Sequence, residues 1–219
     1  MRQLFAPGAD AIFRLSLLVV VAGVVGLFLI TAGFSRSSFV TNVGVAPDQP
    51  APFSHKHHSG ELGIDCRYCH QGVEKLATAG IPPTWTCMTC HSQIWTGAPV
   101  LQAVRDSLAQ NKPLEWTRVN RLPSYVYFNH SIHIGKGVGC SSCHGDVTAM
   151  QLTSRANAFE MGFCLNCHRN PQQFVRPQSE IFNMTWSPPS DQDKVGAALV
   201  ARYHIGQPEK LTDCSICHR

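Results

Sequence analysis

Charge is scarce in this sequence of 219 residues, since only 15% of them are Asp, Glu, Lys or Arg. The net charge is +4, and the lysines and arginines are scattered without forming a run. A protein that binds nucleic acid needs a basic patch or stripe that neutralises phosphate groups. The sequence therefore predicts no nucleic-acid partner.

Strand patterns and catalytic constellations are also missing. No segment keeps the alternation of apolar and polar residues that indicates a half-buried strand. No acid–base or nucleophile constellation can be recognised either, so we expect no enzymatic activity from the chain by itself. Residues 100–111 carry Leu101, Val104 and Leu108 at helical spacing. We expect a mostly α fold with short helices, long loops and no sizeable sheet.

No cysteine stands outside a C-x-x-C pair, and a histidine follows every pair at once. The five copies read CRYCH, CMTCH, CSSCH, CLNCH and CSICH. Their cysteines are Cys66, Cys69, Cys87, Cys90, Cys140, Cys143, Cys164, Cys167, Cys214 and Cys217. C-x-x-C-H is the attachment site of c-type haem, in which the thiols form thioethers and the histidine reaches the iron.

Zinc sites and disulfides are the alternatives for such cysteines. Zinc ribbons do not need a histidine after every pair, and five pairs do not divide evenly into four-cysteine sites. Disulfides would leave the five adjacent histidines unexplained. The sequence therefore predicts five haems c, with their porphyrins supplying much of the apolar core. The predicted proximal ligands are His70, His91, His144, His168 and His218.

The remaining histidines supply candidates for the second axial position. The pattern F-[SN]-H-x-x-H occurs twice, as "FSHKHH" before the first two motifs and as "FNHSIH" before the next two. A repeat of this kind predicts two similar di-haem units. The predicted distal ligands are His55, His58, His130, His133 and His204. His57 is then left over, and His57 or Met161 is an alternative distal ligand.

His204 is assigned to the fifth motif because it lies ten residues before Cys214. The segment 190–204 is predicted to be a short helix with Ser190 as its N-cap, ending before Gly206. A histidine at the end of a packed helix has the fixed direction that an iron ligand needs. The alternative is an exposed histidine favoured by the dipole at a helix C-terminus.

The N-terminal region contains an uncharged apolar run of 20 residues, Leu15 to Phe34. At about 1.5 Å per residue it spans roughly 30 Å, one hydrocarbon core. The run is longer than the apolar region of a signal peptide, and no A-x-A site follows it. We expect an uncleaved single-pass anchor in a bacterial inner membrane. Covalent haem attachment takes place on the outer side, so we expect the haem domain to face the periplasm.

The predicted organisation has three parts. Residues 1–34 form an N-terminal segment with the anchor helix, residues 35–52 a proline-containing linker, and residues 53–219 the pentahaem cytochrome c domain. Within this domain we expect di-haem units over about 53–99 and 128–171, and a single-haem segment over about 190–219.

Several long stretches resemble a known family. The order F-x-H-x-x-H before C-x-x-C-H resembles the class III multihaem cytochromes. "FSHKHH", "GIPPTWTCMTCHSQIW", "LPSYVYFNHSIHIGKGVGCSSCHG" and "MGFCLNCHRNP" are similar to the pentahaem, membrane-anchored cytochrome c subunit of alternative complex III. The resemblance implies an electron-transfer subunit in a quinol-oxidising respiratory or photosynthetic complex. It also implies partners: integral membrane quinol-oxidising subunits, an iron–sulfur subunit that donates electrons, and a monohaem cytochrome c subunit or external acceptor.

Two other functions stay open. A multihaem reductase would need one haem with an open axial position, which the equal numbers of haems and distal histidines disfavour. A free-standing membrane-anchored quinol dehydrogenase often carries a methionine two residues after a motif histidine. Here those positions hold Gly72, Gln93, Asp146 and Asn170.

Overall fold

The computed structural model describes residue 6 and residues 8–218. These residues fall into two compact units that divide between Val43 and Gly44. Over this part of the chain the regular elements are helices, with no strand longer than an isolated bridge. The mostly α fold class is therefore confirmed.

The first unit contains the apolar helix α1, Ala9–Arg36, and one helical turn, α2, Ser38–Thr41. The predicted span from Leu15 to Phe34 lies inside α1, whose mean hydropathy reaches 2.7 and none of whose residues is buried. With 28 residues the helix is about 42 Å long, more than one hydrocarbon core. By length and composition α1 can cross a membrane. The turn α2 falls within the predicted linker, residues 35–52.

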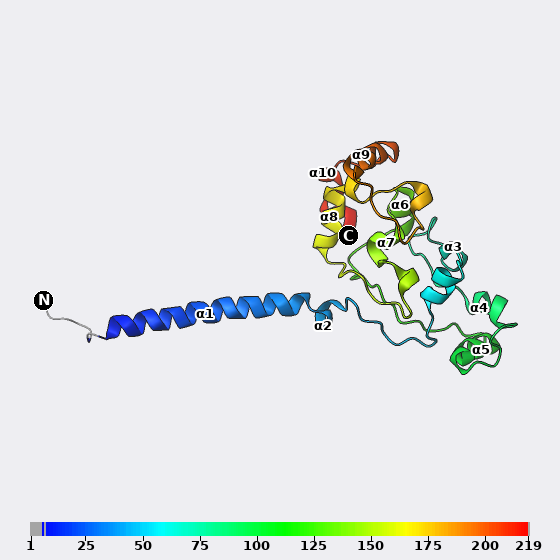
Figure 1. Cartoon of the computed structure of the whole chain (residues 1–219), viewed down its shortest axis with the longest axis horizontal. Coiled ribbons are helices and arrows are strands. Elements are labelled where there is room, and N and C mark those ends of the chain that lie inside the picture. The colour runs from blue at the N-terminus through cyan, green and yellow to red at the C-terminus, as the bar shows by residue number, and fades with distance from the viewer. Residues whose placement is uncertain (1–5, 7, 219) are drawn as a thin grey trace. The chain divides into compact units, whose positions relative to one another are not determined.

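The second unit consists of short helices joined by loops (Figure 1). Its α-helices are α3 Cys66–Cys69, α4 Thr84–His91, α5 Gln102–Ala109, α6 His130–Gly135, α7 Cys140–His144, α8 Met161–Arg169, α9 Gln192–Arg202, α10 Pro208–Leu211 and α11 Cys214–Cys217. One π-helix is η1 Lys56–Glu61, and the 3-10 turns are η2 Pro99–Leu101, η3 Val147–Ala149, η4 Pro171–Gln173 and η5 Gln178–Glu180.

The side-chain core of this unit is small. Val73, Ile134 and Ile181 form its central cluster, with Cys140 and Phe182 packed against it. These residues come from segments that follow the first motif, precede the third and follow the fourth. The cluster therefore fixes the third motif beside the segment that follows the first.

The helix predicted over 100–111 is confirmed as η2 followed by α5. Val104 is buried, and the hydroxyl groups of Ser107 on α5 and Thr84 on α4 are 2.6 Å apart. This contact ties α5 to the helix that carries the second motif.

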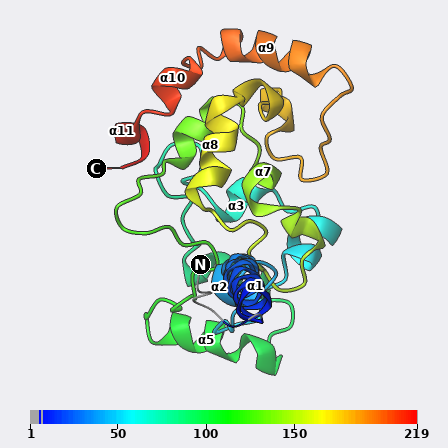
Figure 2. The same ribbon diagram turned by 90° about the vertical axis from the view of Figure 1, so that its left-hand side faces the viewer.

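The predicted C-terminal helix is present as α9, but Ser190 as its N-cap is wrong. The helix begins at Gln192 with Asp191 as the N-cap. The side-chain amide of Gln192 donates to the carbonyl groups of Gln172 and Val175, which fixes the start of the helix against η4. A Cβ at Gly196 would overlap the carbonyl oxygen of Gln172, so glycine permits this close packing. Figure 2 shows α9 and α10 along one edge of the unit.

Candidate haem sites

Every C-x-x-C pair lies on a helical turn. The turns are α3, α7 and α11 and the C-terminal parts of α4 and α8. Residues three apart face the same side of a helix, so both thiols of a pair are directed to one side. All ten cysteines are free thiols, none of them fully buried. This is the form in which two thioether bonds to one porphyrin can be made.

Four of the five motif histidines face the ring of an upstream histidine. The ring pairs are His55 with His70, His58 with His91, His130 with His144, and His133 with His168. Their ring centroids are 6.4, 6.1, 6.4 and 6.2 Å apart, with interplanar angles of 9°, 64°, 4° and 30°. In each H-x-x-H turn the first histidine pairs with the nearer motif and the second with the farther one.

These separations fit an iron between each pair of rings. A metal–imidazole bond is about 2 Å long and the nitrogen lies roughly 1.1 Å from the ring centre, so two imidazoles on opposite sides of one metal have centroids roughly 6.3 Å apart. Direct ring stacking would allow closer approach. Apolar side chains near the pairs, including Leu76, Ile81 and Ile132, stand more than half exposed, as partners for a porphyrin face. The residues present therefore fit haem.

The Nδ1 atoms of the paired rings are held by the protein. In five rings Nδ1 lies 2.7 to 2.9 Å from a backbone carbonyl oxygen, at Gly80 for His70, Ser54 for His58, Ala77 for His130, Asn129 for His133 and Leu211 for His168. His91 has a longer contact of 3.4 Å to the carbonyl oxygen of Ile94, and His55 lies 2.8 Å from the hydroxyl of Thr153. Since Nδ1–H donates to a carbonyl oxygen, Nε2 carries the lone pair that a metal needs.

His144 is held by a side-chain amide. Its Nδ1 lies 2.9 Å from Nδ2 of Asn120, while Oδ1 of Asn120 is buried without a hydrogen-bond partner. Turning the amide by 180° places the oxygen against Nδ1–H and satisfies the buried acceptor. His144 then presents Nε2 in the same way as the rings held by carbonyl oxygens.

The two H-x-x-H turns repeat the same ring geometry around a phenylalanine. The Phe53 centroid is 4.9 Å from His55 in an edge contact and 4.4 Å from His58 in a stacked one. Phe128 lies 4.8 Å from His130 and 4.3 Å from His133, with nearly identical angles. The phenylalanine of the repeat therefore orients both imidazoles of each turn.

Burial favours the neutral form of several paired imidazoles. It lowers the pKa of both His55 and His144 to about 4, and it lowers the pKa values of His58 and His133. A histidine must be neutral to bind iron, so the environment of these rings suits ligation.

The two alternative ligands occupy other positions. His57 is exposed, with Nδ1 3.0 Å from a carboxylate oxygen of Glu61 and its ring near Trp95 rather than a motif histidine. Met161 begins α8 and is 65% exposed.

The fifth motif has a different neighbour. The ring that faces His218 is that of Tyr125, with centroids 5.9 Å apart. His204 is exposed and follows α9 with a φ of 50°, the left-handed conformation common at helix C-termini. Among the described residues no ring contact joins His204 to His218. Its backbone carbonyl and that of Tyr203 accept hydrogen bonds from Lys136, at 3.3 and 2.6 Å.

Comparison with known proteins agrees with this site chemistry. Residues 126–219 match the family "Cytochrome c7 and related cytochrome c". Over 176 residues the chain is 34% identical to the multihaem cytochrome c subunit of the menaquinone reductase of Nitratidesulfovibrio vulgaris strain Hildenborough, covering 78% of this chain and 77% of the relative. The chain belongs to the cytochrome c7-like multihaem cytochromes c.

A second relative of this multihaem cytochrome is the cytochrome subunit of the acrylate reductase of Shewanella woodyi. It is 24% identical over 113 residues, which cover 51% of this chain and 69% of the relative. Both relatives are cytochrome subunits of reductases, so the chain is an electron-transfer subunit of the multihaem type.

The motifs of the multihaem cytochrome adjoin one another in an order that differs from the sequence. The second and first motifs meet where the hydroxyl groups of Tyr68 and Thr89 lie 2.8 Å apart, and the central cluster packs the segment after the first motif against the third. Asn157 donates to the carbonyl of Cys143, and the ring of Phe159 lies between His144 and Phe163 of α8, linking the third motif to the fourth.

The fourth motif leads to the fifth, because His168 bonds the carbonyl of Leu211, three residues before Cys214. The order is second, first, third, fourth, fifth. Figure 1 shows α4, α3, α7 and α8 following one another across the unit in this sense.

Sequence reasoning missed several residues of these sites. Asn120 and Thr153 hold ligand rings from outside any motif, and Tyr125 faces the last motif histidine. Phe53 and Phe128 were visible as part of the repeat, and their constant place before each histidine pair was the available signal.

Proposed function

We propose that this multihaem cytochrome carries five haems c and relays electrons within a quinone-linked membrane complex of the alternative complex III type. The observation that carries the proposal is the set of four histidine ring pairs with centroids 6.1 to 6.4 Å apart. When bound, each haem supplies a one-electron ferric–ferrous couple.

The protein side chains suit carriage of electrons rather than conversion of a substrate. Each proposed pair would offer two imidazoles with anchored Nδ1 atoms to one haem iron, which would leave no position for a substrate. Fixed rings also keep the same ligands in both oxidation states, which lowers the reorganisation that accompanies each transfer. We therefore propose that the chain alone has no enzymatic turnover.

The contacts between the motifs support a relay whose two ends are the second and the fifth motif. The second motif is carried by α4, which is tied to α5 through Thr84 and Ser107. The fifth is carried by α11 near Val126, with which His218 forms an isolated bridge. We propose that partner subunits exchange electrons at these two ends.

The apolar helix α1 supports a place at a membrane. We propose a single-pass anchor in a bacterial inner membrane with the haem domain on the periplasmic side. Integral quinol-oxidising subunits, an iron–sulfur subunit and a monohaem cytochrome c are the proposed partners.

A second direction of electron flow has support of its own. The relative with 34% identity is a subunit of an enzyme named menaquinone reductase, so this chain could deliver electrons to quinone instead of accepting them from quinol. Reduction of the haems by a menaquinol analogue in membranes, with block by a quinone-site inhibitor, supports the first direction. Reduction only by a periplasmic donor, followed by reoxidation by menaquinone, supports the second.

The proposal is tested by counting and classifying haems in the full chain purified in detergent. A pyridine haemochrome assay should give five haems per chain, since there are five motifs. Low-temperature EPR and near-infrared magnetic circular dichroism should show at least four bis-histidine haems, one for each ring pair. Fewer than four bis-histidine signals at full haem content would refute the pairing.

A further inference from the structure

A buried arginine lies against the third motif. Arg176 is only 3% exposed, and an isolated antiparallel bridge between Val138 and Val175 brings its backbone alongside the residues that lead into Cys140. Its backbone N–H donates to the carbonyl of Gly137 at 2.8 Å. The backbone of Arg176 is therefore fixed beside the segment that leads into the turn α7.

The guanidinium contacts the two residues between the cysteines of this motif. Nη1 donates to the hydroxyl of Ser141 at 3.1 Å and to the carbonyl of Asn183 at 3.2 Å, and Nη2 donates to the hydroxyl of Ser142 at 2.9 Å. Cζ lies 4.3 Å from the centroid of the Trp186 ring. These partners orient the group but are all uncharged.

No carboxylate among the described residues lies within 4.0 Å of this guanidinium, and the Glu180 carboxylate acts on it only from a greater distance. Its Nε is buried without a hydrogen-bond partner, and a Cβ at Gly139 would overlap Cζ, so the chain leaves room for the cation next to Cys140. A buried unpaired charge is costly unless another group offsets it. An arginine retained in such a place points to a use for its charge.

We propose that Arg176 is a positioning residue whose positive charge, which forms no direct ion pair with a carboxylate among the described residues, raises the reduction potential of the haem at Cys140, Cys143 and His144. This inference deepens the proposed relay function and rests on it. The third motif is the middle site of the spatial order, so the charge makes the centre of the relay the preferred place for an electron.

The sign follows from electrostatics. A ferric haem carries one more positive charge than a ferrous haem. No bond is made or broken when the ferric haem takes up one electron. A nearby cation disfavours the ferric state, and a low-dielectric surrounding strengthens the effect. The guanidinium donates to the hydroxyl groups of both Ser141 and Ser142, so the charge lies directly against the turn between Cys140 and Cys143.

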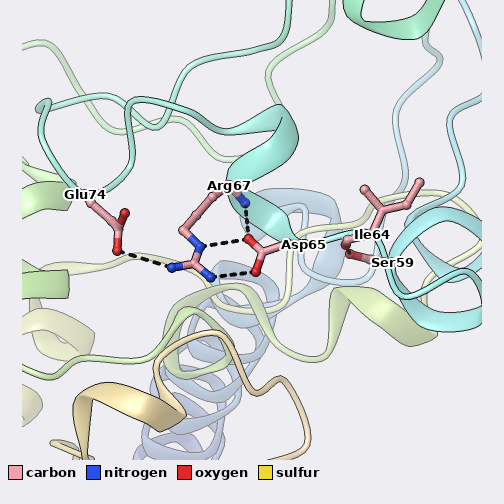
Figure 3. Close-up of polar contacts among 5 residues, drawn as sticks. All are labelled: Ser59, Ile64, Asp65, Arg67 and Glu74. Atoms are coloured by element: carbon pink, nitrogen blue, oxygen red, sulfur yellow. Dashed lines mark hydrogen bonds and ion pairs between the residues drawn. The ribbon is translucent and has the colours of Figure 1, made fainter. Parts of the chain in front are cut away.

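The first motif supplies a matched contrast. Arg67, between Cys66 and Cys69, also lies over an aromatic ring, with Cζ 4.6 Å from the centroid of Phe182. It is exposed, and its guanidinium forms a two-bond pair with Asp65 at 2.9 and 2.7 Å and lies 3.8 Å from Glu74 (Figure 3). Carboxylates and solvent cancel most of its field, so the same change should have little effect there.

The experiment is a spectroelectrochemical titration of the full chain, followed by EPR of each haem. The third haem is recognised as the one whose signal changes in His130→Ala. Arg176→Gln should lower the midpoint of that haem so that its ferrous-to-ferric ratio at fixed potential falls about tenfold, which is about 59 mV for one electron. Arg176→Lys should restore most of the value, and Arg67→Gln should change the ratio at its own site less than about twofold.

A second pair of variants tests the inference if Arg176→Gln is not produced with its full complement of haems. Ser142→Asp places a carboxylate next to the retained guanidinium and should lower the midpoint of the third haem, whereas Ser142→Asn should leave it unchanged. Two results would overturn the inference about Arg176 without affecting the proposed relay. One is an equal midpoint of the third haem in Ser142→Asp and Ser142→Asn. The other is an equal midpoint in Arg176→Gln and the wild type when both carry their full haem content. Loss of reversible haems from the wild-type chain would instead overturn the proposed relay.

Discussion

At the first four motifs each motif histidine faces an imidazole from an H-x-x-H turn, whereas at the fifth motif His218 faces the phenol ring of Tyr125. The first arrangement is built locally. A phenylalanine and two histidines lie within six residues, and the phenylalanine contacts both rings. The second depends on two distant segments, residues 125–127 and the C-terminal turn, joined by the hydrogen bond from Tyr127 N–H to the Cys217 carbonyl at 2.8 Å.

The difference shows what makes a ligand position predictable. A turn that fixes its own side chains presents them in the same way wherever it occurs, and the two copies of the repeat agree closely in ring distances. A position supplied by one residue on a separate helix depends on how that helix packs. His204 is such a residue, and it ends α9 exposed and in the left-handed region.

The largest effect should come from removing both histidines of one local turn. In the variant His130→Ala with His133→Ala, the haems at the third and fourth motifs lose their facing imidazoles, so two of the five predicted haems should become high-spin. EPR of the ferric protein measures this directly. His57→Ala is the matched control, because that exposed ring contacts Glu61 and faces no motif histidine, and it should leave the spectrum unchanged.

Retention of every low-spin signal in the double variant would contradict the pairing. Conversion of a haem to high spin in His57→Ala would mean that the ligand register of the first turn is shifted by one residue.

A smaller effect, on one haem only, is predicted for His204→Ala. Because five motifs need five further imidazoles, His204 stays the predicted distal ligand of the fifth haem. The ring of His204 is exposed, so the segment after α9 would have to bring this ring to His218 for it to bind the iron. The expected result is a single high-spin haem with the other four unchanged. Tyr125→Phe, which keeps the facing ring and removes the hydroxyl, is the comparison variant.

If His204→Ala keeps every low-spin signal, His57 or Met161 supplies the ligand or the fifth position is open. Carbon monoxide distinguishes these outcomes, since tight binding at one haem of the wild-type chain requires an open position and favours a reductase role.

Much of this molecule follows from its sequence. The C-x-x-C-H motifs predict where haems attach, and the H-x-x-H repeat predicts which imidazoles are available. The absence of sustained alternation predicts a fold without a sheet, and the apolar run predicts α1. These features depend on short-range spacing, which can be read along the chain.

Other features depend on tertiary contacts and could not be predicted. That His55 faces His70 and His58 faces His91, rather than the reverse, follows from how the π-helix η1 lies against the first and second motifs. The order of motifs follows from the cluster of Val73, Ile134 and Ile181, whose members are far apart in the sequence. Arg176 has no sequence signal, because it is buried by contacts with segments distant in the sequence, including the bridge between Val138 and Val175.

The smallest effect concerns the second layer of one local site. Asn120 comes from outside both repeats, yet it holds Nδ1 of His144, as carbonyl groups hold the rings of His130 and His133. Asn120→Asp should place a carboxylate against Nδ1–H of His144, which strengthens electron donation by the ring and lowers the midpoint of the third haem. We expect at most a tenfold fall in the ferrous-to-ferric ratio of this haem, about 59 mV.

Asn120→Leu should remove the hydrogen bond to Nδ1 of His144. It should broaden the EPR signal of the same haem without converting it to high spin. Potentiometric titration with EPR detection measures both effects. The control is Asn170→Asp, because the side-chain amide of this C-cap residue donates to the Asn166 carbonyl of the preceding helix. A midpoint in Asn120→Asp equal to that of the wild type would show that the amide does not accept from Nδ1–H, and that the His144 ring is fixed by packing alone.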